Sequence, residues 1–243
     1  MLKEARKKYH EDGFLSLVKV AVKIGYDDYI RPSLPRRVVQ YNGVPVKAYH
    51  IGDSLIPWQS KDIPGYEAAI VEGLNKFVET DDTVVIVGGG WGISTVVAAN
   101  NIGDQGEVIT YEGGSETVRN IRNTVKLNMV AQKVSIHHAV VGPAISLRDD
   151  ENAAESVSPT DLPECDVLVL DCEGAEMEIL EEMDIRPRNI IVETHSIFDS
   201  PEEKVRDRLT QSGYQILRST VAEERLRREC EEKGIYVLFA LRE

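Results

Sequence analysis

The sequence predicts a mostly parallel α/β sheet that is covered by helices on both faces. From residue 83 onward, short apolar segments rich in β-branched residues alternate with segments of helical spacing. The segment at 83–87 is apolar enough for a central strand, and four glycines follow it within five residues. A strand, a glycine turn and a helix form half of a nucleotide-binding unit, because the turn and the helix N-terminus expose backbone N–H groups.

The same alternation continues to the end of the chain. Strands are predicted at 83–87, 107–111, 134–138, 167–171, 188–193, 214–218 and 235–241, and helices at 65–79, 92–101, 114–128, 174–183, 201–212 and 221–233. Ligands of such sheets bind at the carboxyl ends of the strands. The residues at or just past those ends are Gly88, Glu112, His138, Asp171 and His195. The polar segment 148–161 is predicted to be an exposed loop beside this edge.

Two parts are expected: an appendage of residues 1–60 and a main domain of residues 61–243. The appendage combines a helix over 2–24 with a β-hairpin around Asn42-Gly43, a strong hairpin signal between alternating apolar runs. The N-terminal helix is basic, which leaves open a peripheral membrane contact, a homodimer contact, or docking on its own domain.

The composition, 42% hydrophobic and 28% charged over 243 residues, is that of a globular protein with a core. No apolar run reaches the roughly 18 residues of a transmembrane helix, and the N-terminus lacks a secretory signal, so we expect a cytoplasmic protein. The net charge of −13 disfavours a nucleic-acid partner, since phosphates repel an acidic surface. Three cysteines without CxxC spacing indicate neither a disulfide framework nor a zinc site.

The glycine loop is followed, about 20 residues later, by an acid at the end of the second strand. Glu112 lies where a carboxylate accepts hydrogen bonds from both ribose hydroxyls of an adenosyl ligand. The glycine spacing is GxGxG rather than G-x-G-x-x-G, and the lysine of a phosphate-binding P-loop is missing. The alternatives are a tight turn without a ligand and a helix-start acid favoured by the helix dipole.

A second group of candidate residues follows the strands at 167–171 and 188–193. Asp171, Glu173 and Glu176 come at the end of the first strand, and Glu193 and His195 end the second. A histidine with an ordinary pKa near 6.5 is a candidate general base. Glu176 has an alternative role as a helix cap, His195 one as a structural residue, and the paired carboxylates one as ligands of a divalent cation.

These blocks, GGGWGIST, YEG, LDCEGAEMEIL and VETH, together resemble the signature blocks of FkbM-type methyltransferases, which use S-adenosylmethionine. The resemblance covers about residues 65–200. It implies a Rossmann-like, seven-stranded sheet whose last strand, here 235–241, is antiparallel. It also implies O-methylation of a hydroxyl on a sugar, glycan or small metabolite. The family often carries an acid just before the glycine loop, where this sequence has Ile86, so the cofactor's ammonium group must find loop carbonyls or another acid.

The predicted catalytic residues are Asp171, Glu173 and His195, and no metal is required in principle. The predicted S-adenosylmethionine-binding residues are Gly88, Gly89, Gly90, Trp91, Gly92, Glu112, Gly113, His138, Ala139 and Asp171. Two other classes stay open: an NAD-linked oxidoreductase, which the glycine spacing disfavours, and a non-catalytic interaction protein that binds an adenosyl ligand.

Overall fold

The computed structural model describes residues 30–50, 62–142 and 154–242. The chain falls into two compact units, one of residues 1–39 and 47–61 and the other of residues 40–46 and 62–243. In the first unit a 3-10 turn at Arg31–Ser33 precedes a contact in which His50 Nδ1 lies 2.7 Å from the carbonyl oxygen of Leu34. The helix predicted over 2–24 lies outside the described residues.

The predicted hairpin is confirmed, with Asn42 and Gly43 both at positive φ in the turn, as a type I′ connection requires. Its strands and their neighbour are β1 (Arg36–Tyr41), β2 (Val44–His50) and β3 (Asp62–Ile63), in the order β2-β1-β3. The tip of the hairpin belongs to the second unit. There Asn128 donates a hydrogen bond of 2.9 Å from its side chain to the carbonyl oxygen of Pro45.

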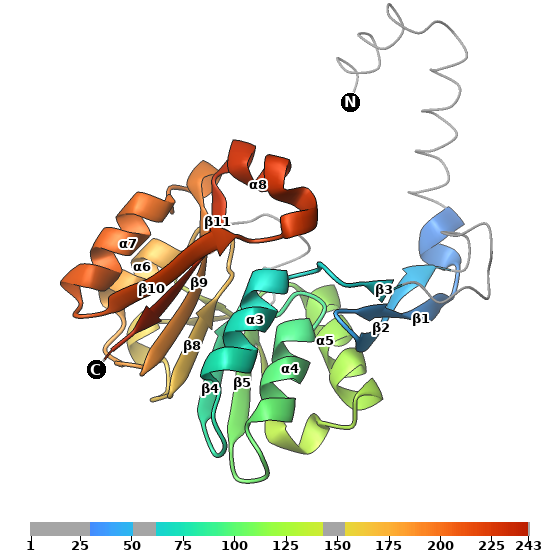
Figure 1. The fold of residues 1–243 in the computed structure, drawn as a ribbon. Coiled ribbons are helices and arrows are strands. Elements are labelled where there is room, and N and C mark those ends of the chain that lie inside the picture. The colour runs from blue at the N-terminus through green and yellow to red at the C-terminus, as the bar shows by residue number, and fades with distance from the viewer. Residues whose placement is uncertain (1–29, 51–61, 143–153, 243) are drawn as a thin grey trace, which may run out of the picture. The chain divides into compact units, whose positions relative to one another are not determined.

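The second unit contains an eight-stranded sheet. Its strands are β4 (Thr83–Val87), β5 (Glu107–Glu112), β6 (Val134–Val141), β7 (Glu155–Val157), β8 (Val167–Leu170), β9 (Asn189–His195), β10 (Gln215–Val221) and β11 (Ile235–Leu241). Their order across the sheet is β10-β11-β9-β8-β4-β5-β6-β7 (Figure 1). Among the described residues, every strand pair in this sheet is parallel except those of β11 with β9 and β10, so the antiparallel last strand is confirmed.

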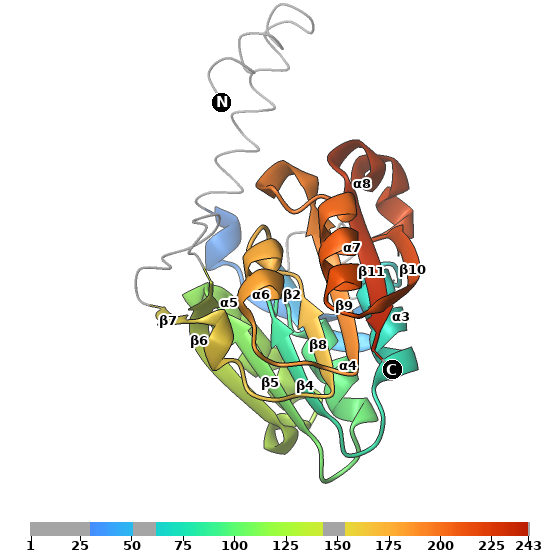
Figure 2. The same ribbon diagram turned by 90° about the vertical axis from the view of Figure 1, so that its left-hand side faces the viewer.

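Helices cover both faces of this sheet, as the alternating pattern predicts. They are α3 (Ala68–Phe77), α4 (Ile93–Asn101), α5 (Ser115–Leu127), α6 (Glu176–Glu182), α7 (Glu202–Gln211) and α8 (Arg227–Lys233). The first three lie against one face, and α6 and α7 lie against the other (Figures 1 and 2). None of the described helices is long and apolar enough to span a membrane.

The central strands are buried on both faces because both faces are covered. The side chains of β4 from Val84 to Val87 are at most 3% exposed. Helix α3 approaches the sheet closely at Gly73, where a Cβ atom would lie 2.7 Å from Phe239 and 2.9 Å from Ile191. Burial of such apolar surface is worth about 25 cal/mol per Å², so these layers hold the sheet rigid behind the strand ends.

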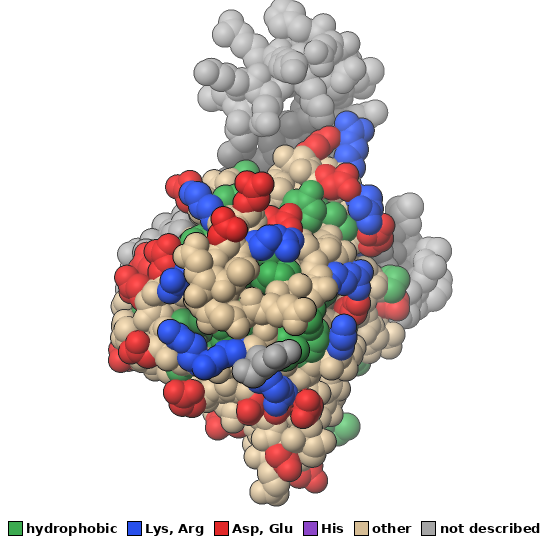
Figure 3. Space-filling model, turned by 60° about the vertical axis from the view of Figure 1, so that its left-hand side comes forward, with side chains coloured by type: hydrophobic (Ala, Val, Ile, Leu, Met, Phe, Trp, Pro, Cys, Tyr) green, Lys and Arg blue, Asp and Glu red, His purple; other side chains and the backbone are tan. Residues whose placement is uncertain are grey.

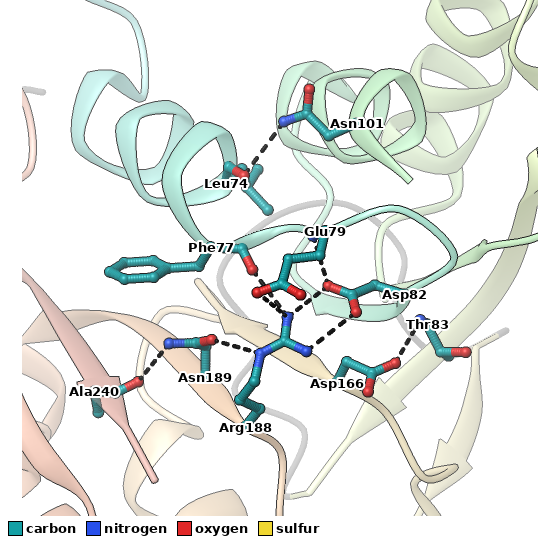
Figure 4. Close-up of polar contacts among 10 residues, drawn as sticks. All are labelled: Leu74, Phe77, Glu79, Asp82, Thr83, Asn101, Asp166, Arg188, Asn189 and Ala240. Carbon is teal, nitrogen blue, oxygen red and sulfur yellow. Dashed lines mark hydrogen bonds and ion pairs between the residues drawn. The ribbon is translucent and has the colours of Figure 1, made fainter. Parts of the chain in front are cut away.

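A partly buried ionic network joins the amino ends of β4 and β9 to the end of α3 (Figure 4). Arg188 donates hydrogen bonds to Asp82 at 2.8 and 3.3 Å and to the carbonyl oxygen of Phe77 at 3.1 Å. Asp82 also accepts the backbone N–H of Glu79 at 2.7 Å. Because the network lies at the amino ends, it fixes the register of the strands whose other ends carry the candidate site.

Two local predictions are wrong in the described residues. The predicted loop 148–161 contains β7 and the 3-10 turn Pro159–Asp161, because residues 155–157 pair with the end of β6. The predicted helix at 221–233 is instead the end of β10, a 3-10 turn at Glu224–Leu226 and the shorter α8. The charges that suggested one long helix pair locally, as in the contact of Lys233 with Glu229 at 2.6 Å.

The direction in which strands are added reverses at β4, whose neighbours β5 and β8 lie on opposite sides. The pairing of β4 with β8 ends at Val87 and Leu170, so Gly88 and Asp171 come next to each other. Gly88 has a φ of +90°, and a Cβ atom there would lie 1.8 Å from the carbonyl oxygen of Asp171. Glycine is therefore required at this switch point, where ligands of open α/β sheets bind.

We expect Gly88→Ala to reduce the free energy of unfolding by more than about 4 kcal/mol or to prevent folding, because the methyl group would overlap the Asp171 backbone. Gly213→Ala is the matched control. Gly213 has a similar φ of +86° but no atom within 4 Å of its Cβ position, so it should cost only about 1–2 kcal/mol. Urea unfolding measures the loss of stability in both variants, and equal losses would contradict the close contact between Gly88 and the Asp171 backbone.

Candidate functional site

A cavity of about 370 Å³ lies at the carboxyl ends of the strands in the second unit. Its lining includes the glycine loop, the end of β5, the residues after β8, the end of β9 and the connection between β10 and β11. This size is in the range of small-molecule sites. The predicted site residues that line it are Gly88, Gly90, Glu112, Gly113, Ala139, Asp171, Glu173 and His195. Gly89, Trp91, Gly92 and His138 are not among the lining residues.

The glycine loop follows β4 and turns into α4. Gly88, Gly90 and Gly92 all have positive φ, a conformation that side chains with a Cβ atom rarely adopt. Gly92 donates a backbone hydrogen bond of 2.7 Å to Gly89, which closes the turn. The absence of a Cβ atom at Gly88 allows the close approach of the Asp171 backbone, and its absence at Gly90 leaves the loop backbone open to the cavity.

Glu112, at the end of β5, fastens this loop. One carboxylate oxygen accepts the N–H groups of Gly89 at 3.1 Å and Gly90 at 3.3 Å, and the other accepts that of Gly114 at 2.8 Å. A carboxylate can accept about four hydrogen bonds, so the same group can position the loop and face a ligand. The predicted ribose contact stays a prediction, and the structure adds a role that the sequence did not indicate.

His138 acts next to the cavity rather than in its wall. Its Nε2 atom lies 2.9 Å from the carbonyl oxygen of Gly113, so the imidazole N–H holds the turn after β5. The following residue, Ala139, does line the cavity. Val140 and Val141 line it as well, so the end of β6 borders the cavity beyond His138.

Asp171, Glu193 and His195 form a cluster at the ends of β8 and β9. His195 Nε2 lies 3.4 Å from Glu193 Oε1 and 3.9 Å from Asp171 Oδ1. On its other side, His195 Nδ1 lies 2.9 Å from Glu176 Oε1. The adjacent parallel strands thus bring together the two sequence blocks that were predicted to meet.

Glu176 is fully buried and satisfies several donors at once. It accepts the backbone N–H groups of Cys172 at 3.3 Å and Gly174 at 2.8 Å, a capping role that the sequence left open. It also accepts the Nδ1–H of His195. Burial raises the pKa of Glu176, but the hydrogen bond and charge of His195 outweigh burial, so its pKa is lowered and the group is ionised.

The same contacts determine the charge of His195. Burial lowers its pKa, but hydrogen bonds to Glu176 and Glu193 and the charge of Asp171 raise it more, to about 11. His195 is therefore an imidazolium at neutral pH and cannot accept a proton there. By contrast, burial and the charge of Glu193 raise the pKa of Asp171 well above its usual range, although His195 opposes this.

Glu173 lines the cavity with its backbone in the left-handed region at a φ of +53°. The ligand-type atoms of Asp171, Glu193 and His195 all lie within 4.8 Å of one another. Such a set can bind a divalent cation if His195 is neutral, so the cation alternative stays open.

Several further residues line the cavity without having been predicted as site residues. Among them are Tyr66 and three glutamates: Glu67 before α3, Glu193 at the end of β9, and Glu223 in the connection between β10 and β11. Glu193 ends a predicted strand, so the strand-end rule was enough to find it. Glu67 and Glu223 precede helical segments, where an acid is typical without any ligand.

No protein-family model and no curated protein match this sequence. Solved structures do. Ribosomal protein L11 methylase from Lactobacillus delbrueckii subsp. bulgaricus is similar with a TM-score of 0.50 and 16% identity, over 72% of this chain and 77% of that one. P. horikoshii TYW2 in complex with MeSAdo is similar with a TM-score of 0.54 and 16% identity, over 86% of this chain and 72% of that one. The aTrm5 chain in its complex with tRNALeu is similar with a TM-score of 0.55 and 11% identity, over 87% of this chain and 54% of that one. The chain therefore has the Rossmann-like fold of methyltransferases.

We expect the imidazole ring of His195 to keep its charge from pH 6 to pH 9. Its pKa is raised above the unfolded value near 6.5. Its contribution to the free energy of unfolding is therefore complete below pH 6.5 and is lost as pH rises toward 11. Glu176→Gln should lower the pKa of His195 because it removes the strongest partner. Nitrogen-15 NMR of the histidine ring measures the pKa of His195 in the parent protein and in the variant. Titration of His195 near pH 6.5 in the parent protein would contradict its pairing with Glu176.

Proposed function

We propose that this protein is an S-adenosylmethionine-dependent methyltransferase that methylates a hydroxyl group on a sugar, glycan or small metabolite. One observation carries the proposal. A glycine loop held by a strand-end glutamate shares a cavity with a carboxylate and histidine cluster, at the switch point of a methyltransferase-type sheet. The FkbM-type assignment is part of the proposal and rests on the sequence blocks alone.

The described residues fit such a cofactor. The loop from Gly88 to Gly92 would hold its methionine part, and Glu112 with Gly113 its ribose, while Ala139 borders the adenine. The open backbone at Gly90 is the cradle that a side chain would fill. When bound, the cofactor supplies an activated methyl group, so the protein itself has only to orient the acceptor and remove its proton.

Asp171 is the best candidate for the proton acceptor among the three predicted catalytic residues. Its carboxyl lines the cavity and its pKa is raised, which brings its basicity closer to that required at neutral pH. His195 is instead a fixed cation that holds Asp171 and Glu193 in place. Glu173 borders the same cavity and would contact the acceptor.

An NAD-linked oxidoreductase is the weaker alternative. The pyrophosphate of a dinucleotide binds to free N–H groups of the glycine loop. Here the N–H groups of Gly89 and Gly90 already donate to Glu112, and the Glu67 carboxyl stands 3.3 Å from the Cβ position of Gly90. Two phosphates would therefore meet carboxylates where they need donors.

The acceptor is not identified by the fold, since the structurally similar proteins include a ribosomal protein methylase and a complex with tRNA. A nucleic-acid acceptor would need a basic surface. On the face shown in Figure 3, acidic and basic side chains are interspersed. With a net charge of −13, this distribution supports a small or uncharged acceptor. We also propose that residues 1–60 are an appendage that contributes acceptor or subunit contacts.

The cofactor assignment is tested by calorimetric titration with S-adenosylhomocysteine and with NAD. We expect binding of the first only. Glu112→Gln should weaken it about 10- to 100-fold, because a charge-assisted hydrogen bond is worth roughly 1.5–3 kcal/mol. Glu107→Gln, at the exposed start of the same strand, is the control. Unchanged affinity in a folded Glu112→Gln protein would refute the ribose contact, and binding of NAD alone would refute the function.

The catalytic assignment is tested with Asp171→Asn in single-turnover methyl transfer to the acceptor found by screening with labelled cofactor. We expect a loss of about 10²–10⁴-fold in rate, as for loss of a general base, with cofactor affinity within a few-fold of the parent. Asp184→Asn, an exposed aspartate after α6, should leave the rate unchanged. An Asp171→Asn protein that turns over at the parent rate would place the base elsewhere.

A further inference from the structure

Glu67 faces the glycine loop from outside the sheet. It immediately precedes α3, and its backbone adopts the left-handed conformation at a φ of +49°. Its N–H group donates a hydrogen bond of 3.0 Å to Glu223, which holds the turn in place. The side chain lines the cavity, and Oε1 lies 3.3 Å from the position of a Cβ atom on Gly90.

The other carboxyl oxygen of Glu67 has no hydrogen-bond partner in the described part of the chain. Oε2 is buried and makes no hydrogen bond to any of the described residues. A buried carboxyl oxygen without a donor is costly, and such a group at a cavity wall is usually completed by a ligand. A helix-start glutamate with a merely structural role would instead have both oxygens bonded or in solvent.

The strand residue before the loop cannot supply the missing acidic contact. Ile86 is completely buried between the layers of the sheet, so its side chain faces the core rather than the cavity. Glu67, which comes from a different element, brings a carboxyl group to the tip of the same loop. The cofactor's amino-acid part carries an ammonium group that needs such a partner.

We propose that Glu67 binds the α-ammonium group of the cofactor's methionine part, with its buried Oε2 atom as the acceptor. The proposal rests on the proposed function, since it presupposes S-adenosylmethionine in this cavity. It assigns the ammonium contact to a residue from the start of α3, outside the sequence blocks on which the cofactor site was predicted.

The charges around Glu67 favour a cationic ligand. Burial and the charges of Glu193 and Glu223 raise its pKa to about 8, while hydrogen bonds from the Ser94 backbone and the Tyr66 side chain lower it. Asp171 lies close enough for its own pKa to be raised by Glu67. At pH 7 the free protein therefore holds a proton on Glu67, and an ammonium group that replaces this proton must release it.

The experiment compares two ligands that differ in one part. S-adenosylhomocysteine carries the amino-acid group, whereas 5′-methylthioadenosine has the same adenosine and sulfur without it. Glu67→Gln should weaken the binding of S-adenosylhomocysteine about 10- to 100-fold and change the affinity for methylthioadenosine by less than about threefold. Glu72→Gln, the same substitution at an exposed position of α3, should affect neither ligand.

Proton release gives a second readout that needs no variant. Calorimetry at pH 7 in buffers of different ionisation enthalpy should show close to one proton released per S-adenosylhomocysteine and none per methylthioadenosine. The affinity for S-adenosylhomocysteine should rise between pH 6 and pH 8, as Glu67 in the free protein loses its proton. Glu67→Gln should abolish both effects, and its thermal unfolding shows whether it is folded.

The outcomes separate this inference from the proposed function. If a folded Glu67→Gln protein binds both ligands equally more weakly, or binds both as tightly as the parent, the role of Glu67 is overturned and the cofactor assignment stands. Absence of proton release from the parent protein would show that Glu67 is already ionised in the free protein, and the comparison of the two ligands would then decide its role. Failure of the parent protein to bind either ligand would instead refute the proposed function.

Discussion

The contact between Gly88 and the backbone of Asp171 is the constraint on which the site depends. Asp171 donates its N–H to the carbonyl oxygen of Val87 at 2.9 Å, and Gly88 donates its N–H to that of Tyr111 at 3.0 Å. Three parallel strands therefore end in register, with no space for a side chain on Gly88. Because the glycine loop continues from Gly88 and the acidic cluster from Asp171, one contact sets the distance between the two halves of the cavity.

The charge balance of the cavity follows from that arrangement. Strand ends bring Asp171 and Glu193 together, and their repulsion would be costly without a cation between them. His195 supplies that cation, and Glu176 on its far side keeps the proton on the ring. A histidine so strongly paired has a positioning role. In the proposed reaction, the proton acceptor is therefore a carboxyl group whose pKa is raised and not the histidine.

The sequence was sufficient for the sheet and for one edge of the site. Apolar periodicity identified each strand from β4 to β11 apart from the short β7, and the rule that ligands lie at carboxyl ends found Glu112, Asp171 and His195. The charge of His195 could not be foreseen, because it depends on Glu176, 19 positions earlier in the chain. Glu67 could not be found either, since only the tertiary structure brings the start of α3 to Gly90.

The acidic character of the cavity has a consequence for turnover in the proposed reaction. S-adenosylmethionine carries a sulfonium charge that its thioether product lacks, while the ammonium and the ribose are the same in both. Asp171 and Glu193, which would lie near the sulfur, would attract the donor more than the product, whereas contacts to the ammonium and ribose would bind both equally. Glu67 and Glu112 would therefore set how tightly the cavity holds an adenosyl ligand. The cluster around His195 would set how readily the spent ligand is exchanged for a new donor.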